Sequence, residues 1–89
     1  MGLDTVEIVL WAEKEFDIAI TDAEAGEVST VGDFSLLIYH LILAQHGLKN
    51  TINEETIYNK VKALLIKQYA VKESQIGRDA KFVQDLRLE

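Results

Sequence analysis

The amino-acid sequence predicts an all-α fold, a bundle of four helices with a long C-terminal loop. Apolar residues recur at helical spacing in several stretches, and the chain contains no proline that would interrupt a helix. Its 89 residues are enough for one hydrophobic core. Because there is no cysteine, disulfides and thiolate metal sites cannot stabilise the fold. We therefore expect a single domain over residues 1–89, stabilised by helix packing.

The first helix is expected over residues 3–15. The apolar residues that fall near its period are Leu3, Val6, Val9 or Leu10, and Phe16. Its first turn contains Asp4 and Glu7, and carboxylates are favourable at the positive end of a helix dipole. A loop follows, and then a short helix over about 22–27. Thr21 or Asp22 can cap it, with Ala25 and Val28 turned inward.

The third helix is predicted from Thr30 to His46. Thr30 is the expected N-cap, and Asp33 lies at the third helical position, where its carboxylate can complete a capping box. Gly47 follows the last apolar residues and can adopt the left-handed conformation common at helix ends. His46 near this end is most simply a favourable charge for the helix C-terminus.

The fourth helix is expected to open at Asn53 and to run to about Tyr69. Its predicted inner face comprises Ile57, Val61, Leu64, Leu65 and Gln68. From Ala70 onward the helical period is lost. Residues 70–86 are expected to form an extended loop held on the bundle by apolar anchors, namely Val71, Ile76, Phe82, Val83 and Leu86.

Charge is distributed unevenly along the chain. Residues 1–46 contain nine acidic residues and one basic residue, whereas residues 47–89 contain six acidic and eight basic residues. An acidic surface without a basic stripe disfavours nucleic-acid binding and favours a protein partner with a basic patch. The apolar runs around His40 are too short for a membrane span, and no signal-peptide pattern is present. We therefore expect a cytoplasmic protein.

Three blocks of sequence resemble the acyl carrier protein family, in an altered order. Met1-Gly2-Leu3-Asp4-Thr5-Val6-Glu7, Glu13-Lys14-Glu15-Phe16 and Thr30-Val31-Gly32-Asp33 resemble the second half of a carrier protein, which begins Asp-Ser-Leu-Asp-Thr-Val-Glu. Val61 to Ile66, Val71 to Ser74 and Ala80 to Leu86 resemble its first helix and long first loop. The resemblance implies a circularly permuted acyl-carrier-protein-like four-helix bundle, in which residues 1–46 match the second half and residues 54–89 the first.

The permuted order makes one demand on the linker. Residues 47–53 must join the old C-terminus to the old N-terminus, and about seven residues reach at most roughly 25 Å. This reach favours a monomer, although a domain-swapped dimer would make the same local contacts.

The departures from the family pattern lie where the prosthetic arm would be attached. Gly2 stands at the position of the modified serine, and Arg87-Leu88-Glu89 stands where Gly-Ala-Asp would precede that serine. Glycine has no hydroxyl, so no covalent phosphopantetheine and no other cofactor is expected. Three other serines, Ser29, Ser35 and Ser74, lack the Leu-Asp-Thr-Val-Glu context that a transferase would recognise.

In the family, the helix that matches residues 3–15 docks on basic patches of synthases, reductases and transferases. The resemblance therefore implies a partner-binding surface made of Asp4, Glu7, Leu10, Trp11, Glu13 and Glu15. A solvated acidic face is the alternative for the carboxylates, and packing against the loop around Phe82 is the alternative for Trp11.

Two functions follow from the resemblance. The first is a binding module of fatty acid or polyketide metabolism that carries no acyl group. The alternative is a noncovalent acyl or lipid carrier with a cavity near Ala12, Ile20, Ala25, Val28 and Phe82, or an atypical carrier modified at another serine. Catalysis is not expected, because no pocket or acid–base pair is indicated. A metal site is not expected either, since His40 and His46 are six residues apart rather than four.

Overall fold

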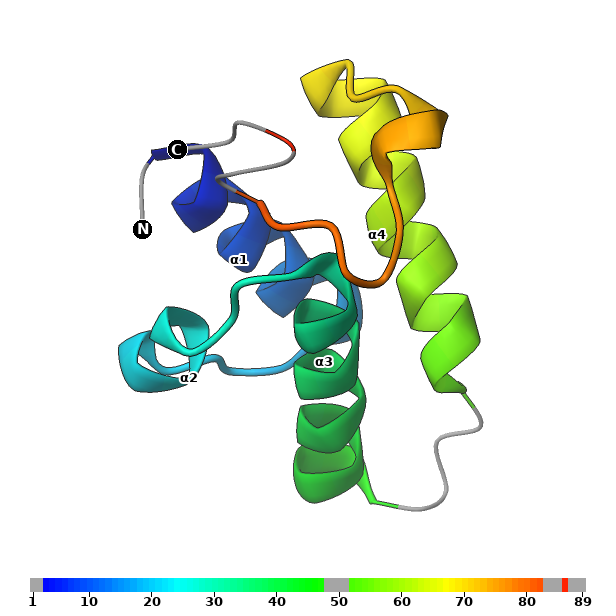
Figure 1. The fold of residues 1–89 in the computed structure, drawn as a ribbon. Helices are drawn as coiled ribbons and strands as arrows, with labels where there is room; N and C mark the ends of the chain where they lie inside the picture. Colours follow the sequence, from blue (N-terminus) through cyan, green and yellow to red (C-terminus); the bar gives the residue numbers. More distant parts are fainter. Residues whose placement is uncertain (1–2, 48–51, 83–85, 87–89) are drawn as a thin grey trace.

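The computed structural model describes residues 3–47, 52–82 and 86, with side chains described from residue 6 onward. These residues form four α-helices and one short 3₁₀ helix (Figure 1). The elements are α1 (Leu3–Phe16), α2 (Asp22–Gly26), α3 (Val31–His46), α4 (Glu54–Tyr69) and η1 (Glu73–Gln75). Within the described ranges, strand-like pairing is limited to one isolated bridge between Thr30 and Lys81. The expected all-α class is thus confirmed for this part of the chain. None of the described helices has the length and apolar character needed to cross a membrane.

Local capping signals define the starts of α2 and α3. The Thr30 hydroxyl accepts a hydrogen bond from the Asp33 N–H at 3.0 Å, and the Asp33 carboxylate accepts one from the Thr30 N–H in return. Thr21 and Glu24 make the same reciprocal pair at α2. Burial opposes ionisation of Asp33, but hydrogen bonds from Ser29 and Thr30 outweigh it and hold the pKa of that carboxyl below its ordinary value. The contribution of the Asp33 cap to stability is therefore lost as the pH falls through that lowered pKa.

The inward face of α1 differs from the predicted one. Ile8, Ala12 and Phe16, spaced four residues apart, are buried, whereas Val6 is 44% exposed. Val6, which falls near the helical period, therefore does not belong to the core. Apolar residues occur on both sides of this helix, and the buried side includes Ala12, whose small side chain gives a weak sequence signal. The methyl group of Ala12 is fully buried, which lets α1 pack closely on its neighbours.

α4 buries the expected residues Ile57, Val61, Leu64 and Leu65, but Gln68 is exposed. The helix ends immediately after this position. Ala70 has a φ of 55°, and the chain turns back so that the Val71 N–H donates to the Leu65 carbonyl at 3.1 Å. Val71 is buried, so it covers the end of the core in place of Gln68.

α1 and α4 run antiparallel within one molecule. The Tyr69 hydroxyl, at the end of α4, donates to the Glu7 carboxylate at 3.2 Å, near the start of α1. Lys60, earlier in α4, pairs with Glu15, at the end of α1, at 3.4 Å. Residues near both ends of α1 are therefore in contact with α4.

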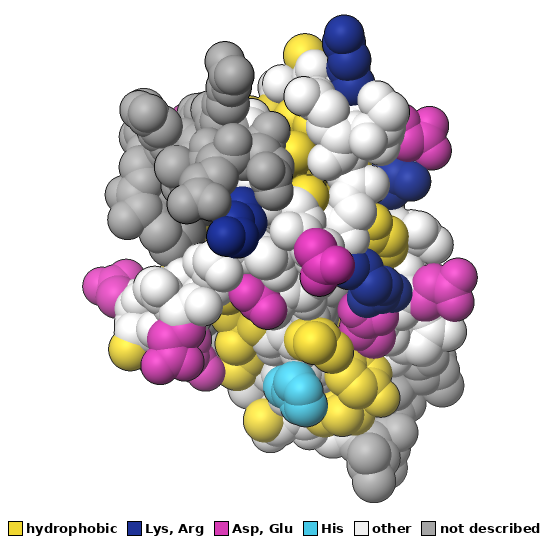
Figure 2. All heavy atoms as spheres, in the orientation of Figure 1, with side chains coloured by type: hydrophobic (Ala, Val, Ile, Leu, Met, Phe, Trp, Pro, Cys, Tyr) yellow, Lys and Arg dark blue, Asp and Glu magenta, His cyan; other side chains and the backbone are white. Residues whose placement is uncertain are grey.

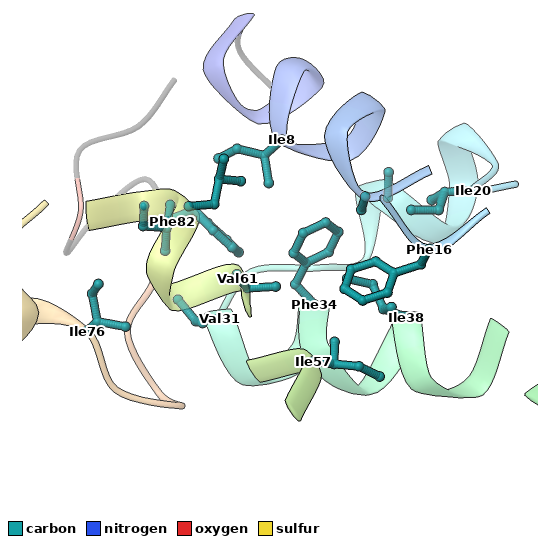
Figure 3. Close-up of a cluster of buried hydrophobic side chains, with 14 of the residues drawn as sticks. Ile8, Phe16, Ile20, Val31, Phe34, Ile38, Ile57, Val61, Ile76 and Phe82 are labelled. Carbon is teal, nitrogen blue, oxygen red and sulfur yellow. The ribbon is translucent and has the colours of Figure 1, made fainter. Parts of the chain in front are cut away.

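The core lies where α1, α3, α4 and the C-terminal segment meet (Figure 3). Its largest fully buried side chains include Phe34, Ile38, Ile57 and Leu65. Phe82 is also buried and packs edge-on against Phe34, with ring centroids 5.9 Å apart. Val71, Ile76, Phe82 and Leu86 are all buried, as expected for anchors of this segment, while Val83 lies outside the described residues.

The C-terminal segment docks through its backbone on the start of α3. The Gly32 N–H donates to the Arg78 carbonyl at 2.8 Å, and neighbouring bonds join Val31 to Ala80 and Phe82 to Ser29. A Cβ atom on Gly32 would lie only 2.7 Å from the Arg78 carbonyl oxygen. A glycine is therefore needed at the second helical position, where the segment approaches most closely.

The C-terminal end of α3 holds the loop between α1 and α2. The Gln45 side chain accepts from the Ala19 N–H at 2.9 Å and donates to the Ala19 carbonyl at 3.0 Å. The His46 ring contacts the Asp17 backbone carbonyl, and Asp17 has a φ of 53°. His46 was expected only as a favourable charge at the end of α3. Its side chain also contacts the α1–α2 loop. Gly47 ends α3 with a φ of 80°, in the positive range expected for this glycine.

Candidate functional site

The residues predicted to bind a partner all lie on α1, but they divide between two sides of that helix. We call Glu7, Leu10, Trp11, Glu13 and Glu15 the acidic α1 surface. Asp4 belongs to the same helix, and its side chain lies outside the described residues. One stripe of this surface borders α4, and the other faces α2.

The stripe that borders α4 contains Glu7, Trp11 and Glu15, spaced four residues apart. Both carboxylates already interact with α4, through Tyr69 and Lys60 respectively, and these contacts are exposed to solvent. Exposed pairs of this kind contribute little to stability. The two acids are therefore available for exchange with a partner's basic side chains at small cost.

Trp11 is half-buried and packs edge-on against Phe16, with ring centroids 5.7 Å apart. Trp11 therefore packs partly on the bundle and is not a fully exposed anchor. Its aromatic neighbour is Phe16 of the same helix rather than Phe82.

The stripe that faces α2 contains the exposed apolar residues of the helix. Leu10 is 59% exposed and Val6 is 44% exposed. Both side chains are too exposed to belong to the hydrophobic core. An exposed aliphatic pair among acidic residues is the kind of surface that a partner with apolar and basic side chains can bind.

Glu13 has a structural role that the sequence did not indicate. Its carboxylate accepts a hydrogen bond from the Ile20 N–H at 3.0 Å, and its side chain is only partly exposed. Glu13 is therefore not a freely solvated carboxylate. The physical reason is that the loop after α1 presents an unpaired backbone N–H, which this carboxylate satisfies.

Beside this stripe lies a hollow of about 310 Å³ between α1 and α2. Most of its lining is aliphatic, and two carboxylates are included. The residues that line it are Val6, Val9, Leu10, Glu13, Ile20, Asp22, Ala25 and Gly26. Figure 2 shows acidic side chains over α2, whereas over α4 and the segment that follows it acidic and basic side chains are mixed.

The five residues predicted to form an acyl cavity are not brought together around this hollow. Ile20 and Ala25 line it. Ala12 and Phe82 are buried in the packed core instead, and Val28 is half-buried against that core. Ala12 therefore does not line the hollow. Its small side chain permits close packing of the helices instead.

The candidate modification sites differ in accessibility. Ser35 is fully buried, and its hydroxyl donates to the Val31 carbonyl at 3.1 Å. Ser29 is exposed and donates to the Asp33 carboxylate at 3.1 Å, and Ser74 is exposed within η1. Gly2, at the position of the family's modified serine, lies outside the described residues.

Metal binding receives no support from the described residues. Among residues 3–47, 52–82 and 86, no group of three or more histidine, aspartate or glutamate side chains is placed to hold a metal ion. His40 is exposed on α3, and His46 is occupied with the loop at Asp17.

Sequence comparison connects part of the chain to acyl carrier proteins. Over 42 residues, 47% of this chain, it is 46% identical to "Acyl carrier protein, chloroplastic" of Brassica napus, and a second Brassica napus protein of that name is 43% identical over 44 residues. "Acyl carrier protein" of Porphyromonas gingivalis is 55% identical over 32 residues, 36% of this chain. The matches span 31%, 33% and 41% of those relatives' lengths, so the chain spans less than half of each. No protein-family profile and no solved structure matches the chain. The chain is therefore similar to acyl carrier proteins over a segment of about half its length.

Proposed function

We propose that this protein is an acyl-carrier-protein-like binding module that carries no phosphopantetheine arm and docks on basic patches of acyl- or polyketide-metabolism enzymes through its acidic α1 surface. The main support is a coincidence of two observations. Part of the chain is similar to acyl carrier proteins, and α1 presents the exposed Leu10 among the carboxylates of Glu7, Glu13 and Glu15.

A circularly permuted order is part of this proposal, and two observations support it. A comparison that follows the chain from one end to the other can match only one half of a permuted protein, and the matches cover 36% to 49% of this chain. In addition, α1 and α4 lie antiparallel within one molecule, joined by the Glu7–Tyr69 and Glu15–Lys60 contacts. Helices assigned to the two halves of the family pattern are thus neighbours, as a permuted bundle requires.

The absence of the arm is tested by attempted modification. After incubation with coenzyme A and a broad-specificity phosphopantetheinyl transferase, the intact mass of the protein is expected to remain unchanged, because Gly2 offers no hydroxyl for the phosphodiester. A carrier protein with the Asp-Ser-Leu motif, treated in the same tube, serves as the positive control. A stoichiometric mass increase would overturn this part of the proposal. Peptide mapping would then distinguish the exposed Ser29 and Ser74 from Ser35, whose hydroxyl is buried.

The docking surface is tested by charge reversal. A double variant with Glu7→Lys and Glu15→Lys is expected to weaken partner capture at least tenfold, chiefly by slowing association, because long-range attraction to a basic patch becomes repulsion. Binding by the unchanged protein should also weaken with added salt, which screens exposed charges over about 10 Å at 0.1 M ionic strength. Glu13 is left in place because it holds the Ile20 N–H.

The matched control reverses two acids elsewhere. Glu73 pairs with Lys62 at the surface, much as Glu15 pairs with Lys60, and Asp79 is exposed. A Glu73→Lys, Asp79→Lys variant changes the net charge by the same amount on the C-terminal segment. Pull-down against enzymes of acyl metabolism, followed by association kinetics, should separate the two variants. If both double variants lose partner binding equally, the effect is due to net charge and not to the α1 surface. If neither variant loses binding, the α1 carboxylates are a solvated face without a docking role.

A noncovalent acyl carrier is the second candidate, and the hollow between α1 and α2 favours it. Its aliphatic lining by Val9, Ile20 and Ala25 suits a hydrocarbon chain, while Glu13 and Asp22 would keep a fatty acid's carboxylate outside. Native mass spectrometry of the protein mixed with a fatty acyl ester tests this function directly. A one-to-one complex that is lost in Ala25→Trp, which fills the hollow, would support it.

A further inference from the structure

The hollow between α1 and α2 has an acidic end and an aliphatic end. Glu13 and Asp22 line it beside the loop that joins the two helices, because the Glu13 carboxylate accepts from the Ile20 N–H at 3.0 Å and Asp22 follows Ile20 by two residues. On α1 the lining continues through Val9 to Val6, seven residues before Glu13. At about 1.5 Å per residue, the aliphatic wall therefore extends about 10 Å from the acidic end.

The two carboxylates of the lining are not balanced by a base within the described residues. Among the described residues that line the hollow there is no lysine, arginine or histidine. Lys14 follows Glu13 in the sequence, but it is exposed and is not part of the lining. From Glu15 to Asp33 the chain contains six acidic residues and no lysine or arginine. The acidic end of the hollow therefore lies in a negative electrostatic potential, which favours a cation.

The carboxylates and the aliphatic wall together select an amphiphilic cation. A fatty acid would bring its own negative charge to Glu13 and Asp22, and a neutral chain would use only the aliphatic wall. An ammonium group on a hydrocarbon chain can use both. One oxygen of the Glu13 carboxylate accepts from the Ile20 N–H, and a carboxylate has further lone pairs that can accept from an ammonium. A wall of about 10 Å suits a chain of about eight carbons.

We propose that this hollow binds a primary alkylammonium of medium chain length, with the ammonium beside Glu13 and Asp22 and the hydrocarbon chain along Val9. The hollow measures about 310 Å³, close to the lower bound of about 300 Å³ for small-molecule sites, so it holds one short chain. The proposal concerns the hollow alone, and it stands whether or not the acidic α1 surface docks on an enzyme. Its ligand class differs from the neutral acyl ester of the second candidate function.

A titration followed by NMR amide shifts tests the charge and the chain separately. The probes are octylammonium, octanol, which has the chain without the charge, and ethylammonium, which has the charge with almost no chain. At about 0.15 M ionic strength, exposed charges are screened over about 8 Å, which limits general attraction to the acidic surface. Octylammonium should give saturable shifts at the amides of Val9, Ile20 and Ala25. Octanol should bind about tenfold more weakly, because it lacks two exposed charge contacts. Ethylammonium should give no saturable shift.

Variants of the same shape test the two carboxylates. Glu13→Gln keeps an oxygen that can accept from the Ile20 N–H and removes the charge, so octylammonium affinity should fall about threefold while octanol affinity stays the same. Asp22→Asn, at an exposed position, should give a similar loss even if Glu13→Gln folds poorly. Glu27→Gln is the matched control, since Glu27 is exposed at the end of α2 and does not line the hollow. It should bind octylammonium like the unchanged protein.

Three results would overturn the proposal. Equal binding of octanol and octylammonium would favour the neutral acyl ligand instead. Shifts of equal size with ethylammonium, or an equal loss in all three variants, would reduce the effect to general attraction between opposite charges. None of these results depends on partner capture, since Glu7 and Glu15, which are reversed in the docking test, do not line the hollow.

Discussion

Replacing Phe82 by alanine is expected to remove about 3 to 5 kcal/mol from the free energy of unfolding. The ring is 5% exposed and packs edge-on against Phe34, which is 2% exposed. The loss would consume a large share of the stability of a domain this small, since folded domains are stable by only about 5 to 15 kcal/mol. Truncation would also weaken the docking of the C-terminal segment, because the ring is a buried anchor next to the backbone bond from the Phe82 N–H to the Ser29 carbonyl.

Urea unfolding followed by circular dichroism measures this loss, with the denaturant slope compared between variants. Ile66→Ala, a truncation of an exposed aliphatic residue, should change stability by less than about 0.5 kcal/mol. A double-mutant cycle with Phe34→Ala should show a coupling of about 0.5 to 1.5 kcal/mol for the ring pair. A cost for Phe82→Ala no larger than that of the Ile66 control would contradict the position of this ring in the core.

Adding a single methyl group at Gly32 should also destabilise the protein, by about 1 to 3 kcal/mol. In an open helix, alanine is better than glycine by about 1 kcal/mol, so propensity alone predicts a gain. At Gly32 the new carbon would lie 2.7 Å from the Arg78 carbonyl oxygen, and this backbone atom is held by the Gly32 N–H itself. The Arg78 side chain is further held by an ion pair with Glu54 and by stacking over Tyr58 at 4.4 Å. To accommodate a methyl group at Gly32, the whole backbone segment around Arg78 must therefore move away from the start of α3.

Gly26→Ala is the matched control for this substitution. Gly26 is also helical, and no atom lies within 4 Å of its ideal Cβ position. The same chemical change should therefore be neutral or stabilising there and destabilising at Gly32. Unfolding in urea reports both values. A gain of similar size at both glycines would show that the C-terminal segment does not press on the start of α3.

The helices and their caps could be predicted because the signals are local. Thr30 and Asp33 are three residues apart and need only each other to form the cap, and the same holds for Thr21 and Glu24. The inward face of α1 could not be predicted in this way. Val6, Val9 and Leu10 give as strong an apolar pattern as Ile8 and Phe16, and only the packed neighbours decide which side is buried.

The candidate site was predictable in composition but not in its internal contacts. The acidity of α1 and the exposure of Leu10 follow from the sequence and the family resemblance, and the structure agrees on the exposure. The bond from the Ile20 N–H to Glu13 had no sequence signal, because any residue carries a backbone donor and any nearby carboxylate can accept it. The close approach of Arg78 to Gly32 likewise joins residues 46 positions apart, where no periodicity applies.

The attachment of α2 has a consequence for local stability. This helix has five residues, and only Ala25 among them is buried. The loop that leads to it is held from outside, by Glu13 at Ile20 and by Gln45 at Ala19. The buried side chains of Ile18, Ile20 and Ala25 also hold the loop and α2 on the core. Because α2 itself buries only Ala25, we expect its amide protons to exchange with solvent by subglobal opening before those of α1, α3 and α4. The hollow between α1 and α2 is lined on one side by this helix, so its width is expected to change whenever α2 opens.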